Sequence, residues 1–218
     1  MLSVTHAKKR LGARAVLDGV DLCCAAGEIA LVLGQNGSGK STLLRAAAGI
    51  FDLDAGSIEI AGHSLRGQPT LAKSKLGYAP DGLEALPDLR ASEYLSLVRG
   101  LRSLPVGPLA PTELEWRERL GIAELAGQRL HSLSFGQRKR VALAAALSGS
   151  PPLLLFDEPS SGLDPTGVDA LAELIRKGQR AGHCHVITSN DAAFMARVGG
   201  TRHHVRGGRL VTIASEQR

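Results

Sequence analysis

Cysteine is scarce in this sequence: Cys23, Cys24 and Cys184 are the only three among 218 residues. They form no Cys-x-x-Cys pair, and adjacent cysteines rarely bridge, so we expect buried thiols in a reducing compartment rather than a disulfide scaffold. No run approaches about 18 consecutive apolar residues, the length that would indicate a membrane-spanning helix. Residues 1–14 lack an apolar stretch of signal-peptide length, and we therefore expect a cytoplasmic protein.

Aromatic residues are also scarce, at 3%, and the basic residues are scattered rather than gathered in a block. Both features argue against nucleic-acid binding, which favours base-stacking aromatics and a basic surface. The net charge of +5 is compatible with an anionic ligand or a membrane surface but identifies neither. With 44% hydrophobic and 22% charged residues, the composition is that of an ordinary globular protein, and the length suits a single domain over 1–218.

Apolar runs and turn signals predict an alternation of strands and helices, and hence an α/β fold with a largely parallel sheet. Two continuous apolar runs, 29–33 and 153–156, have the pattern of strands buried on both faces. A helix is predicted to begin after Asp164, an N-cap followed by proline, and to end at Gly182. The other expected elements are strands at 2–6, 20–24, 76–79 and 184–188, an edge strand at 57–61, a helix at 41–48, a hairpin at 205–213, and helices over 91–147 around a loop at 105–111. We place a helical subdomain at about 85–150.

A glycine-rich loop follows the first buried run and matches the pattern G-x-x-x-x-G-K followed by Ser or Thr. Glycines let backbone N–H groups converge on phosphate oxygens at the start of a helix whose dipole favours anions. Lys40 can reach the β- and γ-phosphates, and the Ser41 hydroxyl can ligate Mg²⁺. The pattern alone also fits an unoccupied glycine turn, but the flanking strand and helix favour a nucleotide site. The predicted nucleotide-binding residues of this loop are Gly34, Gln35, Asn36, Gly37, Ser38, Gly39, Lys40, Ser41 and Thr42.

Two carboxylates, Asp157 and Glu158, follow the second buried run. Ligands of open α/β sheets bind beyond the carboxyl ends of the strands, so both side chains are expected beside the glycine-rich loop. Asp157 can hold Mg²⁺ directly or through water, and Glu158 is placed to polarise a water for attack on the γ-phosphate. Two acids after an apolar run also fit a helix cap or a surface pair, and it is their occurrence after the glycine-rich loop that favours a catalytic role.

Residues 133–140, Leu-Ser-Phe-Gly-Gln-Arg-Lys-Arg, resemble the signature segment of the ATP-binding-cassette (ABC) ATPases, and residues 160–164 resemble the D-loop of that family. The resemblance implies a RecA-like P-loop NTPase core with an antiparallel β subdomain and a helical subdomain. In that family two cassettes pack head to tail, and ATP lies between the P-loop of one and the signature of the other. The residues that would contact the partner's ATP are Ser134, Phe135, Gly136 and Gln137.

Three positions depart from the family pattern. Leu11 stands where an aromatic residue usually stacks on adenine, so apolar contact replaces stacking. Asp81 stands at the position of the Q-loop glutamine, where its carboxylate can ligate Mg²⁺ or be a plain turn residue. Asn190 stands at the position of the switch histidine and can donate one hydrogen bond but cannot carry imidazole chemistry. Losing a preorganised donor to a transition state costs about 100-fold or more, so we expect slow hydrolysis with Glu158 and Asn190 as catalytic residues.

The resemblance implies the ATPase subunit of an ABC membrane transporter, with ATP and Mg²⁺ bound and no nucleic-acid partner. The transmembrane permease would be a separate polypeptide docking on residues 82–101, although most leucines there are expected to be core. The cassettes would pair as a homodimer or heterodimer on the inner face of the cell membrane. The short chain and the Gly-Tyr-x-Pro-acid stretch at 77–81 favour an ABC-2-like exporter. Two alternatives stay open: a catalytically degenerate regulatory subunit of a heteromeric complex, and a non-transport ABC ATPase.

Overall fold

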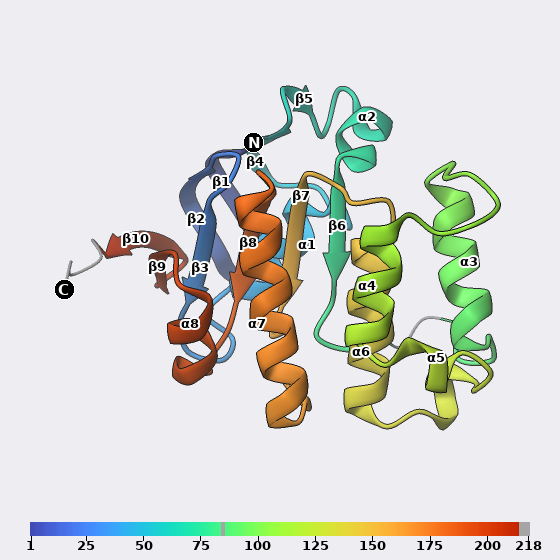
Figure 1. Cartoon of the computed structure of the whole chain (residues 1–218). Coiled ribbons are helices and arrows are strands. Elements are labelled where there is room, and N and C mark those ends of the chain that lie inside the picture. The colour runs from blue at the N-terminus through green and yellow to red at the C-terminus, as the bar shows by residue number, and fades with distance from the viewer. Residues whose placement is uncertain (84–85, 214–218) are drawn as a thin grey trace.

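The computed structural model describes residues 1–83 and 86–213, and within them the strands form two sheets (Figure 1). The larger sheet has six strands in the order β10-β9-β3-β8-β7-β6, and the smaller has four in the order β2-β1-β4-β5. The strands are β1 Leu2–Leu11, β2 Arg14–Cys24, β3 Ile29–Leu33, β4 Ala55–Ile60, β5 His63–Ser64, β6 Leu76–Ala79, β7 Leu153–Asp157, β8 Cys184–Thr188, β9 Thr201–Arg206 and β10 Arg209–Ile213. The helices are α1 Lys40–Ala47, α2 Pro69–Ser74, α3 Ala91–Leu101, α4 Pro111–Arg119, α5 Ile122–Leu125, the 3₁₀ turn η1 Leu130–Ser132, α6 Phe135–Leu147, α7 Pro165–Arg180 and α8 Ala192–Val198.

The larger sheet positions the candidate site because its central strands are parallel and end together. β3, β7 and β8 are buried at every residue, and for β3 and β7 this is expected from the continuous apolar runs at 29–33 and 153–156. β8 pairs with both β3 and β7, so that Thr188 lies opposite Val32 on one side and Asp157 on the other. The loops that follow these three strands therefore meet at one edge of the sheet.

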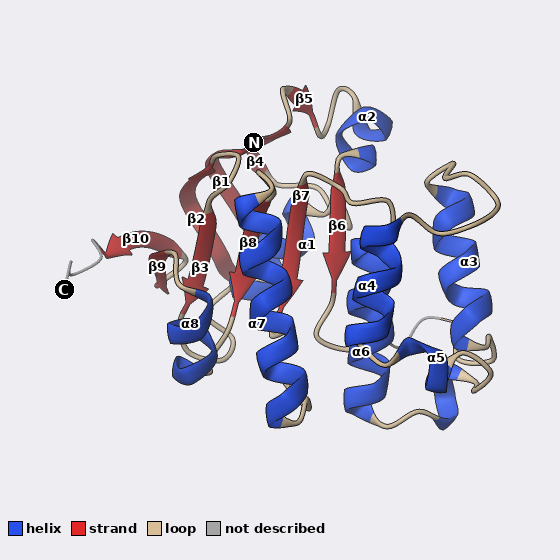
Figure 2. Cartoon of the chain, in the orientation of Figure 1, coloured by secondary structure: helices blue, strands red, loops and turns tan. Residues whose placement is uncertain are grey.

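Helices cover both faces of the larger sheet, which confirms the predicted α/β class. Figure 2 shows α7 and α8 on one face, and α1 lies on the other. Alternate residues of each central strand supply the two separate hydrophobic clusters: Leu31 and Ile187 pack with α7 and α8, whereas Val32 and Val186 pack with α1. A strand buried on both sides is mostly apolar, which is why the apolar runs at 29–33 and 153–156 were readable as β3 and β7.

The smaller sheet is antiparallel, and its buried residues join the cluster that contains α1. β1 and β2 are longer than the predicted strands at 2–6 and 20–24, because the residues beyond those bounds, a mixture of polar and buried apolar side chains, also pair with each other. The prediction of an edge strand at 57–61 is wrong, since β4 lies between β1 and β5. β5 has only 2 residues, too few to produce a readable alternation.

Helices α3 to α6 gather beside β6, at the side of the molecule away from β10 (Figure 1). α6 is the buried centre of this group and contacts α3, α4, α5 and β6. The predicted loop at 105–111 ends one residue earlier, because Pro111 is the first residue of α4, where proline needs no N–H partner. The expected lower bound of a helical subdomain, residue 85, and the last five positions of the expected 1–218 domain, residues 214–218, lie outside the described residues.

The expectation of three buried thiols is wrong for one of them. Cys24 and Cys184 are buried free thiols, but Cys23 is exposed. Cys23 lies on β2, where successive side chains point to opposite faces, and its neighbours Leu22 and Cys24 occupy the buried face. Among the described residues, no helix combines the length and the apolar character needed to cross a bilayer.

Candidate functional site

The glycine-rich loop connects β3 to α1 and requires glycine where the backbone turns. Gly34 and Gly39 have φ angles of +152° and +114°, a backbone conformation that residues other than glycine rarely adopt. A Cβ at Gly39 would lie 2.8 Å from the Val16 carbonyl oxygen, and one at Gly34 would lie 2.6 Å from the Ser38 hydroxyl. Gly39 is the N-cap of α1 and offers no side chain to the first N–H groups of the helix. This helix start is therefore open to an anionic ligand.

Lys40 opens α1 and is only 6% exposed. Its ammonium donates to the Gly34 carbonyl oxygen at 2.7 Å and to the Gln35 carbonyl oxygen at 3.3 Å. It also donates to the Asn190 amide oxygen at 3.3 Å and lies 3.9 Å from a Glu158 carboxylate oxygen. Lys40 is thus held mainly by carbonyl oxygens of its own loop, with a longer ion pair to Glu158, and it places a positive charge at the start of the helix.

Asp157 ends β7 and is fully buried beside Ser41. Its Oδ1 accepts hydrogen bonds from the Ser41 hydroxyl at 3.0 Å and from the Thr188 hydroxyl at 2.6 Å. Its Oδ2 is buried and has no hydrogen-bond partner among the described residues. A buried carboxylate oxygen without a donor is costly unless a cation or ordered water meets it. Ser41 and Asp157 therefore fit the oxygen ligands that Mg²⁺ prefers.

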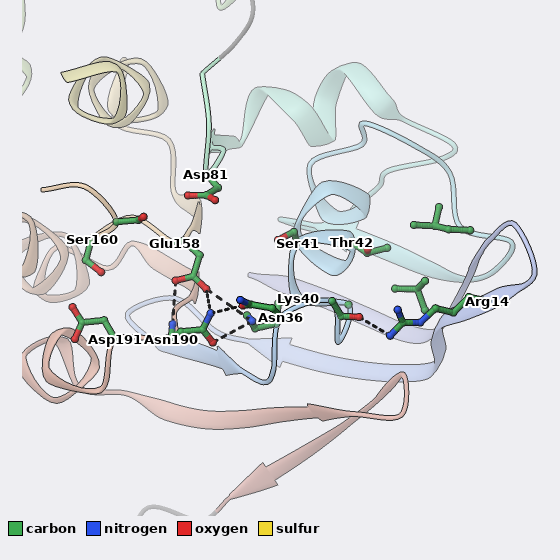
Figure 3. A pocket seen from close by; sticks show the side chains of 15 residues that line it. Arg14, Asn36, Lys40, Ser41, Thr42, Asp81, Glu158, Ser160, Asn190 and Asp191 are labelled. Carbon is green, nitrogen blue, oxygen red and sulfur yellow. Dashed lines mark hydrogen bonds and ion pairs between the residues drawn. The ribbon is translucent and has the colours of Figure 1, made fainter. Parts of the chain in front are cut away.

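Glu158 follows β7 and is held by Asn190 from the loop after β8 (Figure 3). The Asn190 side-chain amide donates to Glu158 Oε1 at 2.8 Å, and the Asn190 backbone N–H donates to Oε2 at 3.0 Å. Burial raises the pKa of Glu158, while the Asn190 hydrogen bond and the Lys40 ammonium oppose that rise. A half-buried carboxylate fixed at both oxygens is suited to orient a water molecule.

Asn190 also reaches the glycine-rich loop, a contact that sequence analysis did not anticipate. Its side-chain N–H donates to Asn36 Oδ1 at 3.0 Å, while its amide oxygen accepts from Lys40. One amide thus bridges Glu158, Asn36 and Lys40, as the dashed lines in Figure 3 show. Asn190, which was expected to act as a hydrogen-bond donor in hydrolysis, therefore links the glycine-rich loop to Glu158 in this structure.

These side chains share one cavity of about 920 Å³. Leu11, the residue expected to contact adenine, ends β1 and lines this cavity while 52% exposed. The other lining residues are Arg14, Val16, Asn36, Gly37, Gly39, Lys40, Ser41, Thr42, Asp81, Glu158, Ser160, Ser161, Asn190 and Asp191. The volume is within the range of small-molecule sites, about 300–1,000 Å³, and the lining is polar and cationic where a phosphate would lie.

Asp81 lies on the loop after β6 and lines the cavity, but its closest partner is a cation. Its Oδ1 accepts from the Lys139 ammonium at 3.0 Å. Burial lowers the pKa of Lys139, and the Asp81 carboxylate opposes that shift. No local sequence pattern predicts this pair, because its members are 58 positions apart. The available signal was a lysine on the apolar face of a helix, in register with Leu143.

The predicted signature residues lie outside the cavity, at the start of α6. The Ser134 hydroxyl accepts from the Gln137 backbone N–H at 3.2 Å, and Gln137 Oε1 accepts from the Ser134 N–H at 2.8 Å. Phe135 is 41% exposed, and a Cβ at Gly136 would lie 2.1 Å from the Gly162 carbonyl oxygen. The segment is therefore a capping box packed on the residues expected to form the D-loop. The structure does not bring it to the P-loop of the same chain.

Comparison with known proteins gives a consistent result. Residues 17–161 match the family model described as ABC transporter. The chain is 30% identical over 190 residues to the linearmycin resistance ATP-binding protein LnrL of Bacillus subtilis, covering 87% of this chain and 61% of that protein. It is 34% identical to the daunorubicin resistance ATP-binding protein DrrA3 of Streptomyces coeruleorubidus, over 76% of this chain and 52% of that protein. It is 39% identical to the aliphatic sulfonates import ATP-binding protein SsuB of Ralstonia nicotianae, over 98% of this chain and 72% of that protein.

Solved structures agree with the fold. The ATP-binding subunit of an ABC transporter superimposes with a TM-score of 0.85 at 24% identity, covering 98% of this chain and 90% of that one. A dimeric ATP-binding cassette, MJ0796, solved in a post-hydrolysis state with ADP and Pi, superimposes with a TM-score of 0.81 at 26% identity, covering 96% of each chain. The chain spans only 61% and 52% of the lengths of LnrL and DrrA3.

Proposed function

The chain belongs to the ABC transporter family, and from this premise we propose that it binds and hydrolyses ATP to drive a transmembrane subunit. The observation that carries this proposal is the convergence of Lys40, Ser41, Glu158 and Asn190 on one cavity of about 920 Å³, with Asp157 bonded to Ser41 at its wall. These groups come from the loops after β3, β7 and β8 and are the parts that phosphoryl transfer needs.

The proposed reaction is attack of water on the γ-phosphorus of ATP, with cleavage of the bond to the bridging oxygen and release of ADP. Lys40 would exchange the Gly34 and Gln35 carbonyl oxygens for the β- and γ-phosphates. Glu158 would orient the attacking water and accept its hydrogen bond. Ser41 and Asp157 would hold Mg²⁺, which supplies positive charge against the phosphate oxygens when bound.

We further propose that the cassette acts as a dimer in which Ser134, Phe135, Gly136 and Gln137 meet the ATP of a partner cassette. The position of this segment outside the cavity of its own chain supports that arrangement, as does the dimeric state of the similar MJ0796 cassette. The Ser134 hydroxyl, whose oxygen only accepts a hydrogen bond within the described residues, and the start of α6 are suitable donors for a phosphate. A homodimer and a heterodimer are both compatible with this geometry.

The proposed cargo route is export, through a permease docked near residues 82–101 on the cytoplasmic face of the membrane. Leu83 and Leu95 are buried, as expected of core, whereas Leu86, Leu97 and Leu101 are exposed and available to a partner. The Gly-Tyr-x-Pro-acid stretch favours an exporter. The similar proteins include two named for drug resistance and one named for import, so their names do not determine the direction of transport. Export is our proposal for this chain.

A catalytically degenerate regulatory subunit of a heteromeric complex is the second candidate, and one observation favours it. Asn190 replaces an ionisable switch residue with an amide that is already bonded to Glu158 and Asn36. An amide has one carbonyl acceptor and one N–H₂ donor group and cannot take up a proton at neutral pH. In this second candidate the chain would bind ATP as a regulatory subunit of a heteromeric complex whose other cassette hydrolyses ATP, whereas the first candidate keeps slow hydrolysis by this chain.

Fractionation of source cells tests the transporter assignment. We expect the chain in the membrane fraction, extracted by detergent together with a polypeptide that carries transmembrane helices, and we expect that complex to hydrolyse Mg-ATP. Recovery of the chain with ribosomes or DNA, and none with membranes, would contradict the transporter proposal and favour a non-transport ATPase.

A further inference from the structure

Lys139 is a charged side chain placed in the interior of the molecule. It lies in the second turn of α6, is 1% exposed, and is among the largest fully buried side chains of the described residues. Its ammonium makes three hydrogen bonds: to the Pro80 carbonyl oxygen at 3.2 Å, to Asp81 Oδ1 at 3.0 Å and to the Asp157 carbonyl oxygen at 3.2 Å. All three N–H donors of a lysine can be satisfied by this set.

These partners belong to the ends of two strands that border the proposed ATP site. Pro80 and Asp81 follow β6, and Asp157 is the last residue of β7. The Lys139 ammonium therefore lies behind the proposed Mg²⁺ ligand, bonded to its backbone, while Asp81 faces the cavity. Asp81 is half-exposed, whereas Lys139 has no exposed side-chain area. A buried ammonium is unfavourable unless an opposite charge and hydrogen bonds replace its water. The buried Lys139 charge therefore needs the Asp81 carboxylate, whereas the half-exposed Asp81 carboxylate can be stabilised by water without Lys139.

The same helix carries the signature segment at its start. Phe135, the first residue of α6, lies one turn before Lys139, and its ring centre is 5.6 Å from the ammonium. Lys139 thus joins three parts of the proposed machinery through one group: the start of α6, the loop after β6 and the end of β7. Within the described residues, the ammonium has no hydrogen-bond partner other than Pro80, Asp81 and Asp157, so no other hydrogen bond there holds it in place.

We propose that Lys139 is a positioning residue, that Asp81 is its counter-ion rather than a direct metal ligand, and that this pair sets the signature helix against the end of β7. The proposal rests on the proposed function, because the signature segment matters only if it meets ATP in a partner cassette. It gives Asp81 a different role from the one expected at the Q-loop position. The two roles predict different results when Asp81 is replaced by a neutral residue. Only the counter-ion role predicts that removing the Lys139 charge as well restores dimer affinity.

The test uses Asp81→Asn, Lys139→Met and the double variant, each in the Glu158→Gln background so that bound ATP persists. We measure the ATP affinity of the monomer by fluorescence titration and the Mg-ATP-dependent dimer affinity by analytical ultracentrifugation. We expect Asp81→Asn to weaken the dimer about 10-fold or more, because a buried cation loses its partner, with ATP affinity changed less than about 3-fold. In the double variant, which lacks both the ammonium and the carboxylate of this pair, the dimer affinity should recover to within about 3-fold of the Glu158→Gln protein.

Other outcomes overturn the proposal in distinguishable ways. If Asp81 is a direct metal ligand, Asp81→Asn weakens binding of Mg-ATP and the second substitution does not rescue it. Equal dimer affinities in all variants would show that the pair positions nothing. If no dimer forms even with Glu158→Gln alone, the proposed dimer fails, and urea unfolding of the nucleotide-free variants then decides the pair: additive losses of stability contradict the coupling, and rescue by the double variant supports it.

A surface pair provides the control. Lys177 on α7 forms an ion pair with Glu115 on α4, but both side chains are well exposed compared with Lys139. Exposed pairs contribute little, so Lys177→Met should leave dimer affinity and ATP affinity unchanged. If Asp81→Asn alone cannot be folded, the folding of the double variant is itself the rescue that the proposal predicts, and failure of both proteins to fold contradicts it.

Discussion

The contact between Asn190 and Glu158 leads to the sharpest prediction about the site. In Asn190→Ala the backbone N–H that donates to Glu158 Oε2 at 3.0 Å is kept, but the side-chain bond to Oε1 at 2.8 Å is lost. The links to Asn36 and Lys40 are lost with it. Glu158 would then be free to rotate about the bond that survives, and it would orient a water molecule less well.

The size of the effect follows from the bonds removed. A hydrogen bond to a charged group contributes about 1.5–3 kcal/mol. At about 1.4 kcal/mol per tenfold change, this corresponds to a loss of about 10-fold to 150-fold in rate. Because one bond to Glu158 survives, we expect the lower part of that range, about 10-fold to 30-fold in kcat. The affinity for ATP should change little, since Asn190 contacts Lys40 only at 3.3 Å.

Steady-state phosphate release with Mg-ATP gives kcat, and titration with a fluorescent ATP analogue gives Kd. Asn190→Asp is the informative partner variant, because it removes the N–H donor and places a second carboxylate against Glu158, so it should be slower than Asn190→Ala. Gln128→Ala is the control, since its exposed amide bonds only the Glu124 carbonyl oxygen at 3.1 Å. A kcat for Asn190→Ala equal to that of the native chain would refute the role given to this amide.

Three further predictions concern the fold and the cation. Burial and neighbouring His183 lower the pKa of His185 to about 3, so the neutral imidazole is favoured in the folded state. The contribution of His185 to stability is therefore complete above the unfolded pKa of about 6.5, and it falls by up to about 1.4 kcal/mol per pH unit as the pH drops below that value. In urea unfolding, the stability of His185→Gln should fall less steeply with acid than that of the native chain. Gly39→Ala forces a side chain into φ +114° and to 2.8 Å from a carbonyl oxygen, and should lose about 1–3 kcal/mol in urea unfolding; unchanged stability would contradict the strain argument. Asp157→Asn should abolish the difference in ATP affinity between Mg²⁺ and EDTA, and an undiminished Mg²⁺ effect would place the cation elsewhere.

Two central strands, β3 and β7, could be predicted because burial on both faces leaves a continuous apolar run. The bounds predicted for 29–33 and 184–188 are those of β3 and β8, and Asp164 caps α7 as its sequence indicates. The smaller sheet was harder to read, since the outer parts of β1 and β2 mix exposed polar residues with buried Ala7, Val16 and Leu17 in no regular alternation. Short elements such as β5, α2 and α8 carry too few residues for a periodic signal.

The site divides in the same way. Local spacing predicts the P-loop and the Asp157–Glu158 pair, because each motif is contiguous and follows a buried strand. The contacts of Asn190 with Glu158 and of Lys139 with Asp81 join segments 32 and 58 positions apart, and no local pattern encodes them. Both contacts involve a position that departs from the family pattern, Asn190 or Asp81. The resemblance therefore could not predict the partners of these two side chains, and the tertiary structure identifies them.

Phosphate release by the purified chain, compared with Glu158→Gln under conditions where both bind ATP, tests the central claim most directly. We predict measurable release by the native chain and a loss of about 100-fold or more in the variant, with ATP affinity retained, because Glu158 orients the attacking water. Release that survives Glu158→Gln would contradict the role assigned to Glu158. A native chain that binds ATP but releases no phosphate would contradict the account of a working ATPase and leave a degenerate subunit that depends on a competent partner.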